Sequence, residues 1–401
     1  MKILFISDVY FPRVNGVSTS IRTFVSQMQA LGHEVHLIAP DYGVATEDEA
    51  WIKRIPARNI YFDPEDRLMR YGVVLKLLPE LREENYDVVH IHTPFVAHYL
   101  GIKLSRLLDI PCLETYHTFF EDYMHHYLPW IPRSMARRIA INTSRRQCNA
   151  VNAIIAPSQP MLDALRSYGV KTSAEVIPTG LQEKSFEEAD GEVFRDRYGI
   201  SRQRPVALFV GRVAHEKNID FLLRMANELR RQQPDMLLVV AGEGPAQKHL
   251  QALSAELALG DNIKFIGYLD RNTELNACYK AADVFVFASK TETQGLVLLE
   301  AMAQGVPVVA LAELGTKSIL IEGEGAMIAP EDERIFASKV FSLFANPGKR
   351  AKLGQAARQY AVKRWTARLQ AERMLQFYQR VQSRSAFHAM NMDNNLKARG
   401  G

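Results

Sequence analysis

Short apolar runs alternate with segments of helical periodicity along almost the whole chain. In the first half, the apolar runs predict buried strands at Lys2–Ser7, Val35–Ala39, Asp87–Ile91, Cys112–Tyr116 and Ala153–Ala156. Between the first two runs, apolar residues recur at helical spacing from Ile21 to Leu31; Ser18 is expected to cap this helix and Gly32 to end it. Strands that alternate with helices predict βα units around a parallel sheet.

A second series of apolar runs follows a polar segment at residues 182–191, which predicts a linker. This series predicts strands at Val206–Val210, Met236–Ala241, Ile263–Gly267, Asp283–Ala288 and Pro307–Ala310. We therefore expect an α/β protein with two doubly wound parallel-sheet domains, one at residues 1–185 and one at residues 200–365. A helix at 366–382 is expected to pack back towards the N-terminal domain, and residues 384–401 are expected to form a flexible tail. A ligand is expected in the cleft where the carboxyl ends of the two sheets face each other.

Composition narrows the class of protein. The chain has 401 residues, of which 47% are hydrophobic and 23% charged, and this balance excludes disordered and fibrous proteins. A net charge of +4 is too small for a dedicated nucleic-acid binder. The 3 cysteines form no C-x-x-C pair, which argues against a disulfide scaffold or a cysteine zinc site and favours a reducing compartment. No apolar run reaches the about 18–20 residues of a membrane-spanning helix, and Met1–Ile6 is too short for a signal sequence, so a cytoplasmic protein is expected.

The segment Ser289–Pro307 is the richest in candidate chemistry. A predicted strand ends at Ala288, a loop carries Glu292, and a helix is expected to begin near Gly295. The free N–H groups at the start of that helix suit an anion. Glu300 follows about two helical turns further on, where it can reach another part of an extended ligand. The alternative is a capping glutamate and a solvated one.

Two further loops of the C-terminal half follow predicted strands. Arg212 and Lys217 lie five residues apart, so that they can converge on a diphosphate, the alternative being a surface turn with solvated cations. Gly242-Glu243-Gly244-Pro245 is similar to a nucleotide-binding glycine turn. It departs from the G-x-G-x-x-G pattern at Gln247, which argues against a dinucleotide cofactor.

Two loops of the N-terminal half carry candidate residues as well. Asn15-Gly16-Val17 gives the backbone freedom to approach a phosphate or a sugar closely, or forms a plain turn. His117 lies at a strand end among acidic and aromatic residues that suit a sugar ring, although these residues could also bind a metal or form a polar surface loop. His90 and His92 lie on one face of a strand and are interpreted as core or rim histidines.

With these motifs together, the chain resembles the retaining glycosyltransferases of family 4, which have the GT-B architecture of two facing Rossmann-like domains. The resemblance extends from Met1 to about Gln382, and its most specific element is the E-x7-E motif from Glu292 to Glu300. It is supported by Arg212 with Lys217, by the glycine turn at 242–245 and by the segment Pro12–Ser18.

The resemblance implies roles for individual residues. It implies that the donor sugar is contacted by Glu292, Gly295 and Leu296, and that Glu300 binds the ribose hydroxyls. It implies that Arg212 and Lys217 hold the diphosphate, and that Gly16 lets the N-terminal domain close on it. His117 matches the histidine that contacts the sugar near the reacting carbon, and Ile266 belongs to a turn that resembles the base-binding turn.

The expected reaction is transfer of a hexose through an oxocarbenium-like state, while negative charge grows on the departing diphosphate. No two aspartates lie two positions apart, so there is no D-x-D triplet to hold a metal, and we expect metal-independent transfer without a cofactor. Retention of configuration is implied by the resemblance. A front-face mechanism is expected because the sequence supplies no obvious nucleophile.

A basic and apolar segment points to a membrane surface. From Tyr123 to Leu162 there is no Asp or Glu, and five arginines alternate with apolar residues such as Trp130, Met135 and Ile139. These arginines are Arg133, Arg137, Arg138, Arg145 and Arg146. A second such stretch is Arg67–Lys76. Tyr123, Trp130 and the five arginines are therefore candidates for contact with the acceptor and with anionic lipid at the inner face of the cell membrane, the alternative being ordinary solvated helix faces.

Within the family, the chain is most similar to the diacylglycerol α-glucosyltransferases, on the residues Tyr116–Thr118, Glu121–Tyr123 and Thr291–Gly295. This resemblance implies UDP-glucose as donor and a membrane lipid such as diacylglycerol as acceptor. The alternatives are GDP-mannose as donor, phosphatidylinositol or a soluble or polysaccharide acceptor, a sugar-nucleotide epimerase, and a non-catalytic nucleotide-sugar-binding protein. No nucleic acid partner is expected, and the sequence does not determine the oligomeric state.

Overall fold

The structure is a computed structural model that describes residues 1–43, 49–60, 63–117, 132–271 and 273–399, without the side chains of 59–60, 63–66, 133 and 385–399. The chain forms two compact units. Unit 1 comprises Met1–Gly180 together with Ala367–Gly401, and unit 2 comprises Leu181–Thr366. Each unit is described by itself.

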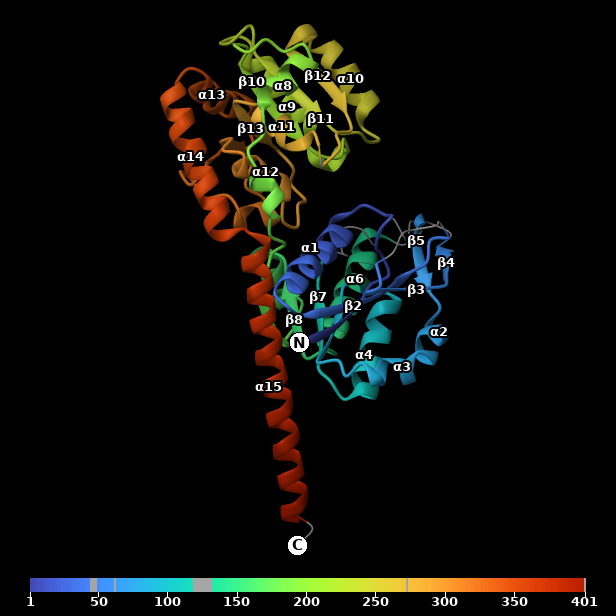
Figure 1. The fold of residues 1–401 in the computed structure, drawn as a ribbon. Helices are drawn as coiled ribbons and strands as arrows, with labels where there is room; N and C mark the ends of the chain where they lie inside the picture. Colours follow the sequence, from blue (N-terminus) through green and yellow to red (C-terminus); the bar gives the residue numbers. More distant parts are fainter. Residues whose placement is uncertain (44–48, 61–62, 118–131, 272, 400–401) are drawn as a thin grey trace. The chain divides into compact units, whose positions relative to one another are not determined.

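Unit 1 is built on a parallel sheet of seven strands in the order β3-β2-β1-β6-β7-β8-β9. Its strands are β1 (Lys2–Ile6), β2 (Glu34–Pro40), β3 (Ile52–Ile55), β6 (Val88–Ile91), β7 (Cys112–Thr115), β8 (Ala153–Ala156) and β9 (Ser173–Val176). A separate antiparallel pair is formed by β4 (Ala57–Ile60) and β5 (Asp63–Met69). The helices around the sheet are α1 (Gly16–Ala30), α2 (Tyr71–Lys76), α3 (Leu78–Glu83), α4 (Val96–Leu108), α6 (Arg133–Cys148), α7 (Gln159–Ser167) and α15 (Ala367–Arg399) (Figure 1).

Two helices of unit 1 show how the sequence sets their positions. The side chain of Asn15 accepts a hydrogen bond from the backbone N–H of Ser18, so Asn15 caps α1 where Ser18 was expected to do so. Helix α15 packs beside α1, and its residue Tyr378 is fully buried in the core of unit 1 (Figure 1). The end of the chain thus completes the core that the first strand begins.

Unit 2 is built on a parallel sheet of six strands in the order β12-β11-β10-β13-β14-β15. These strands are β10 (Val206–Val210), β11 (Leu237–Ala241), β12 (Ile263–Gly267), β13 (Val284–Phe287), β14 (Val308–Ala310) and β15 (Ala326–Ile328). The helices are α8 (Gly191–Arg197), α9 (Ile219–Leu229), α10 (Gln247–Glu256), α11 (Leu275–Lys280), α12 (Leu296–Ala303), α13 (Glu333–Phe344) and α14 (Pro347–Arg364). Short 3-10 turns are η1 (Glu183–Phe186), η2 (His215–Lys217), η3 (Gly260–Asn262) and η4 (Leu314–Ser318). In chain order this strand arrangement is 3-2-1-4-5-6, the order of a Rossmann sheet.

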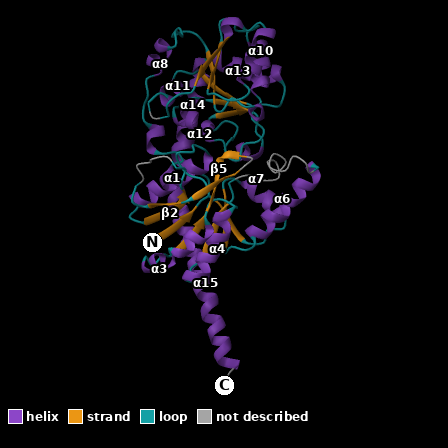
Figure 2. Ribbon diagram, turned by 90° about the vertical axis from the view of Figure 1, so that its right-hand side faces the viewer, coloured by secondary structure: helices purple, strands orange, loops and turns teal. Residues whose placement is uncertain are grey.

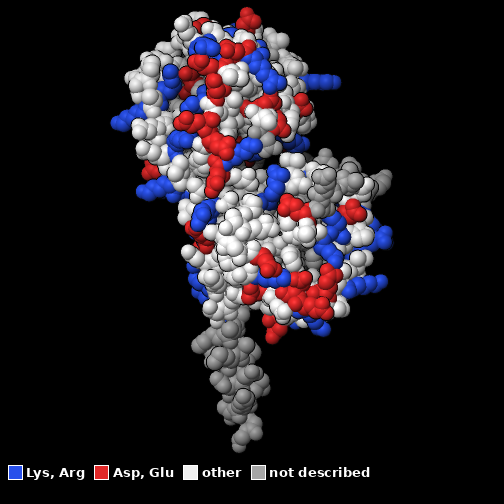
Figure 3. Space-filling view, viewed as in Figure 1, with Lys and Arg blue, Asp and Glu red and all other residues white. Residues whose placement is uncertain are grey.

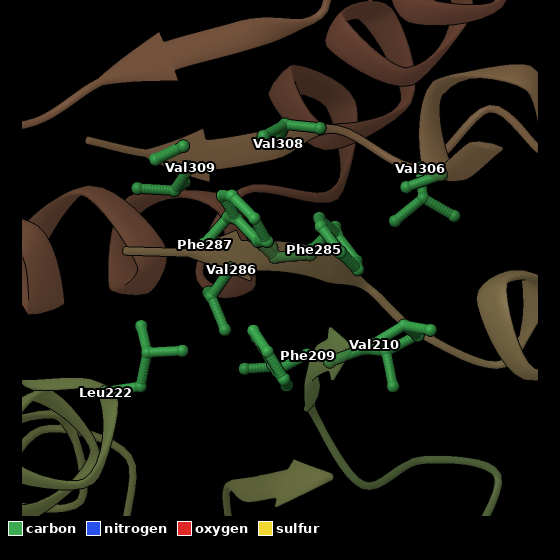
Figure 4. Packing of buried hydrophobic residues seen from close by; sticks show 14 of the residues in the cluster. Phe209, Val210, Leu222, Phe285, Val286, Phe287, Val306, Val308 and Val309 are labelled. Carbon is green, nitrogen blue, oxygen red and sulfur yellow. The ribbon is translucent and has the colours of Figure 1, made fainter. Parts of the chain in front are cut away.

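The core of unit 2 lies on both faces of its central strands. Phe209 of β10 stacks on Phe287 of β13 with ring centroids 5.9 Å apart, and Phe285 lies 6.2 Å from Phe287 (Figure 4). Leu222 of α9 is fully buried in the same cluster. Strands that are buried on both faces read as continuous apolar runs, which is why the sequence predicts them well. Figure 2 shows the strands of each unit with helices around them.

The predicted α/β fold with two doubly wound parallel sheets is confirmed. The division between the units falls after Gly180 rather than after residue 185. The segment expected to be a linker contains η1 and leads directly into α8, whose Phe194 is buried in the core of unit 2. At the other end, α15 continues to Arg399, past residue 384 where a flexible tail was expected.

Each sheet has one position where the strand order reverses, and this position is where ligands bind in such folds. In unit 1 it lies between β1 and β6, and in unit 2 between β10 and β13. The loops that follow these four strands are therefore the candidate ligand-binding loops of the two units. On the face shown in Figure 3, basic and acidic side chains occur together on both units, in keeping with the small net charge.

Candidate functional site

The loops after β10 and β13 are joined across the switch point of unit 2. Lys217, the last residue of η2, donates a hydrogen bond to Glu292 in the loop after β13, and the two side chains form an ion pair. The side chains are only 21% and 16% exposed, so water screens the pair weakly. The amide of Asn218 also donates to the carbonyl of Ala288 at 3.3 Å. These contacts hold a lysine and a glutamate side by side at the carboxyl edge of the sheet.

Glycines let the loops of this edge pack against one another. Gly242, directly after β11, has a φ of +135°, and a Cβ at this position would collide with the carbonyl oxygen of Gly211. A Cβ at Gly315 would collide with the carbonyl of Thr293. The N–H of Gly315 donates to the carbonyl of Glu292 at 2.9 Å, which fixes the backbone of the loop that carries this glutamate. Side chains at these glycines would force the loops apart.

Helix α12 begins directly after the Glu292 loop. Gly295 precedes it in the left-handed conformation with a φ of +95°, and Leu296 is its first residue. Because the first N–H groups of a helix lack intrahelical partners, the start of α12 can donate to an anion. The helix thus begins near Gly295, as expected.

Glu300 lies on α12 and is buried, and its carboxylate has two donors. The hydroxyl of Tyr279 donates to Oε2 at 2.7 Å, and Arg271 pairs with Oε1. Burial is the largest cause that raises the pKa of Tyr279 well above its usual range, and the charge of Glu300 is the next largest. The hydroxyl therefore keeps its proton. Glu300 raises the pKa of Arg271. Sequence reasoning missed Tyr279 and Arg271, since no local pattern connects them with Glu300.

The remaining predicted residues of unit 2 lie around the same edge. Arg212, in the loop after β10, is exposed, and its guanidinium has no ion-pair or hydrogen-bond partner among the described residues. Ile266 is half-buried in β12. Glu243 accepts a hydrogen bond from the N–H of Tyr268, the residue after β12, at 3.3 Å. Arg212 and Lys217 thus follow β10, and the start of α12 follows β13. Ile266 belongs to β12, and Gly242 belongs to the loop after β11.

In unit 1, His117 follows β7 and meets a second histidine. Its Nε2 lies 3.3 Å from Nδ1 of His92, which follows β6. Burial lowers the pKa of His117 to about 4, so its imidazole is neutral at pH 7. The other notable group is Asp8, two residues after the end of β1, which is buried and accepts from the Thr93 hydroxyl and from the N–H of Ala97, both at 2.9 Å.

Gly16 is the first residue of α1, and a Cβ there would meet no atom within 4 Å. Packing against the described residues of unit 1 therefore does not explain a glycine at this position.

The predicted basic and apolar segment forms α6, with one buried stripe of small residues that includes Ala136, Ala140 and Ser144. Met135 and Ile139 are exposed at 51% and 39%, although both are apolar. Four arginines are also exposed, namely Arg137, Arg138, Arg145 and Arg146. Arg133 begins the helix, but its side chain, like Tyr123 and Trp130 entirely, lies outside the described residues.

Two matches to families of known proteins cover most of the chain. Residues 14–184 match the family described as "Glycosyltransferase Family 4", and residues 190–360 match "Glycosyl transferases group 1". The Alpha-monoglucosyldiacylglycerol synthase of Streptococcus pneumoniae is 35% identical over 318 residues, which are 77% of this chain and 71% of that protein. The chain belongs to glycosyltransferase family 4.

Other relatives of this glycosyltransferase act on different sugars according to their names. An Alpha-monoglucosyldiacylglycerol synthase of Acholeplasma laidlawii is 28% identical over 84% of this chain and 86% of its own. A GDP-mannose-dependent alpha-mannosyltransferase of Corynebacterium glutamicum is also 28% identical, over 82% of this chain and 76% of its own. Among solved structures, sucrose-phosphate synthase from Thermosynechococcus elongatus has a TM-score of 0.75 at 22% identity, covering 95% of this chain and 99% of its own, which confirms the GT-B fold.

In this family 4 glycosyltransferase, the residues at the switch point of unit 2 are able to bind both a phosphate group and hydroxyl groups. A lysine, an exposed arginine and a helix start offer positive potential to a phosphate group, while two glutamates offer acceptors to hydroxyl groups. Within the described ranges, no group of three or more His, Cys, Asp or Glu side chains could hold a metal ion. None of the helices in the described part of the chain combines the length and the apolar character needed to cross a membrane.

Proposed function

We propose that the chain transfers glucose from UDP-glucose to a membrane lipid acceptor, diacylglycerol, and forms an α-glycosidic bond. The observation that carries this proposal is the 35% identity with the Alpha-monoglucosyldiacylglycerol synthase of Streptococcus pneumoniae over 77% of the chain. The second synthase, from Acholeplasma laidlawii, supports it over 84% of the chain. The name of each relative specifies both the sugar and the lipid.

The donor is bound in this proposal at the switch point of unit 2. Lys217 and Arg212 hold the diphosphate with the start of α12, Glu292 and the backbone of Gly295 and Leu296 contact the sugar, and Glu300 binds the ribose. The base lies near Ile266 and Gly242. HepE from Anabaena, whose structure contains UDP, supports a nucleotide-sugar donor through its fold, with a TM-score of 0.73 at 18% identity over 94% of this chain and 99% of its own.

The transfer breaks the bond between the anomeric carbon of the sugar and the diphosphate oxygen and forms a bond from the same carbon to the acceptor hydroxyl. The hydroxyl proton passes to the departing diphosphate on the same face of the sugar, so that configuration is retained. Negative charge grows on the diphosphate as the bond breaks, and Lys217, Arg212 and the α12 start stabilise it without a metal ion. His117 contacts the sugar near the reacting carbon.

The acceptor is brought to the enzyme by a membrane surface. The exposed Met135 and Ile139 lie on α6 among exposed arginines, as in helices that bind at a lipid interface. Anionic lipid attracts each such basic residue by about 1 kcal/mol. We therefore place the protein in the cytoplasm, peripherally bound to the inner face of the cell membrane.

A second candidate function is transfer of mannose from GDP-mannose. It is favoured by the mannosyltransferase of Corynebacterium glutamicum, which matches over 82% of this chain. The two functions share the diphosphate and ribose contacts and differ in the base and in the hexose.

One experiment separates these functions. The purified protein is incubated with EDTA, with UDP-glucose, UDP-galactose or GDP-mannose, and with mixed vesicles that contain diacylglycerol, and the products are analysed by mass spectrometry and NMR. We expect an α-glucosyl lipid from UDP-glucose alone. A mannosyl lipid would establish the second function, and free sugar or an epimerised donor without a glycolipid would overturn the lipid acceptor.

A further inference from the structure

Three imidazoles form a row at the carboxyl ends of β6 and β7. The ring centroids of His90 and His92 are 4.1 Å apart, and those of His92 and His117 are 5.5 Å apart with an interplanar angle of 27°. Phe5 of β1 packs against both His90 and His92, with centroid distances of 4.9 and 4.5 Å. The row leads from the core of unit 1 to His117, the residue expected to touch the sugar.

The first histidine of the row is fully occupied by contacts within the fold. Nδ1 of His90 lies 2.6 Å from the hydroxyl of Tyr378, and its Nε2 lies 2.7 Å from the hydroxyl of Thr115. Both nitrogens of His90 therefore have partners, and its burial needs no further explanation.

The second histidine is not satisfied in this way. His92 is 2% exposed, its Nδ1 lies 3.3 Å from Nε2 of His117, and its own Nε2 has no hydrogen-bond partner among the described residues. A buried polar atom without a partner costs about 1–3 kcal/mol. Among the described residues, the contact with His117 is thus the one polar interaction of the His92 ring. The ring is buried even though the unpartnered Nε2 destabilises the fold.

Only one proton lies between Nδ1 of His92 and Nε2 of His117, so the tautomer of one ring determines the tautomer of the other. Burial lowers the pKa of His92 well below its usual range and that of His117 to about 4, so both are neutral at pH 7. A neutral imidazole carries one N–H and one bare nitrogen. If Nδ1 of His92 carries the proton of the contact, Nε2 of His117 accepts it, and His117 holds its own proton on Nδ1.

We propose that His92 is a positioning residue that donates from Nδ1 to Nε2 of His117, and thereby holds His117 in the Nδ1-protonated tautomer and in one ring orientation. His117 then presents a fixed N–H donor to a hydroxyl of the sugar. The unpartnered nitrogen of His92 is in this case a bare lone pair and not an N–H. The inference rests on the proposed function only through the sugar contact of His117.

Two substitutions at His92 distinguish the effect of the hydrogen-bond donor from the effect of the aromatic ring. His92→Phe keeps an aromatic ring at this position and removes the donor, whereas His92→Asn places an amide N–H near the position of Nδ1. We expect His92→Phe to lower kcat roughly 10–100-fold with a small change in the KM of the donor sugar, as other losses of a supporting partner do. His92→Asn is expected to restore most of the rate. His90→Phe is the matched control, because it removes a buried imidazole whose hydrogen bonds go to Tyr378 and Thr115 and not to His117, and it is expected to change stability more than kcat.

The tautomer itself is measured by 15N NMR of histidine-labelled protein without substrates, with the His117 signals assigned through His117→Ala. We expect an N–H at Nδ1 and a bare Nε2 in the wild type and in His92→Asn. In His92→Phe we expect a shift towards the Nε2-protonated form that histidine prefers in water. An unchanged His117 spectrum in His92→Phe would overturn the inference even if the enzyme forms the glucolipid. If the spectrum changes as expected but the wild type forms no glycolipid, the proposed function fails and the positioning of His117 stands.

Discussion

Lys217 and Glu292 form an ion pair that joins the two loops on either side of the strand-order reversal in unit 2. Each side chain holds the other in place. A lysine that is already oriented by a carboxylate needs little reorganisation when negative charge develops beside it, and such preorganisation is the main source of electrostatic catalysis.

This relationship predicts the effect of Lys217→Ala. In the proposed reaction the lysine acts on charge that develops in the transition state, so kcat is expected to fall about 100–1,000-fold while the KM for the donor changes little. Initial rates with UDP-glucose and diacylglycerol vesicles measure both constants. The matched control is Lys290→Ala, because Lys290 lies in the loop after β13 and pairs with Glu331. An increase in KM at unchanged kcat would mean that Lys217 contributes only to ground-state binding.

The hydroxyl of Tyr279 supports Glu300, and its removal tests that support. Tyr279→Phe deletes a hydrogen bond to a carboxylate, an interaction of about 1.5–3 kcal/mol, so the affinity for UDP is expected to fall about 10–150-fold. Calorimetric titration with UDP measures this change. Tyr360→Phe is the control, since the Tyr360 hydroxyl is also buried in unit 2 but donates to the carbonyl of Ile319 at 2.8 Å. Equal UDP affinity in both variants would show that Tyr279 does not position Glu300.

Asp8 makes the stability of unit 1 depend on pH. Burial raises the pKa of its carboxyl to about 7, whereas the unfolded chain loses this proton near pH 4. Between these values the unfolded state binds fewer protons than the folded state, so stability falls as the pH rises from about 4 to about 7. Asp8→Asn removes this titration and is expected to gain stability relative to the wild type over the same interval.

Hydrogen exchange of peptides from β1 and α4 measures this difference at several pH values, after correction for intrinsic exchange. Asp163→Asn serves as the control because Asp163 is an exposed residue of α7 in the same unit. Parallel pH profiles of Asp8→Asn and the wild type would contradict the prediction.

The exposed arginines of α6 are expected to attract anionic lipid. At about 1 kcal/mol for each basic residue, replacing Arg137 and Arg138 with Gln is expected to weaken binding to anionic vesicles about thirtyfold. Cosedimentation at low salt measures the binding. The control replaces two exposed arginines of unit 2, Arg231 and Arg334, and is expected to leave binding unchanged. Equal binding of the α6 variant and this control would exclude α6 from the membrane contact.

The sequence predicts the central strands of both sheets because they are buried on both faces and read as unbroken apolar runs. The edge strands β3, β9 and β15 were missed, whereas the edge strand β12 was predicted. In β9 the residues Ser173–Val176 are all half-buried, and β3 carries Lys53 and Arg54 between its two isoleucines. A strand with one neighbour mixes polar and apolar residues, and four such residues carry too little pattern to be recognised.

In the candidate site, too, some residues could be predicted from the sequence and others could not. Glu292, Glu300, Arg212 and Lys217 belong to local motifs, and a motif can be recognised from spacing alone. Arg271 and Tyr279 reach Glu300 from 29 and 21 residues earlier in the chain, through the packing of α11 and the loop after β12. His92 was interpreted as a core or rim histidine, and only the three-dimensional structure shows that one of its nitrogens meets His117 while the other has no partner in the described part of the chain.

The position of α15 has a consequence for the biosynthesis of the protein. Tyr378 and its neighbours on α15 fill the core of unit 1, yet they are translated after the whole of unit 2. Unit 2 is continuous from Leu181 to Thr366 and has all its core residues as soon as that stretch has left the ribosome. Because domains fold as units during synthesis, the second unit of the chain is able to finish folding before the first.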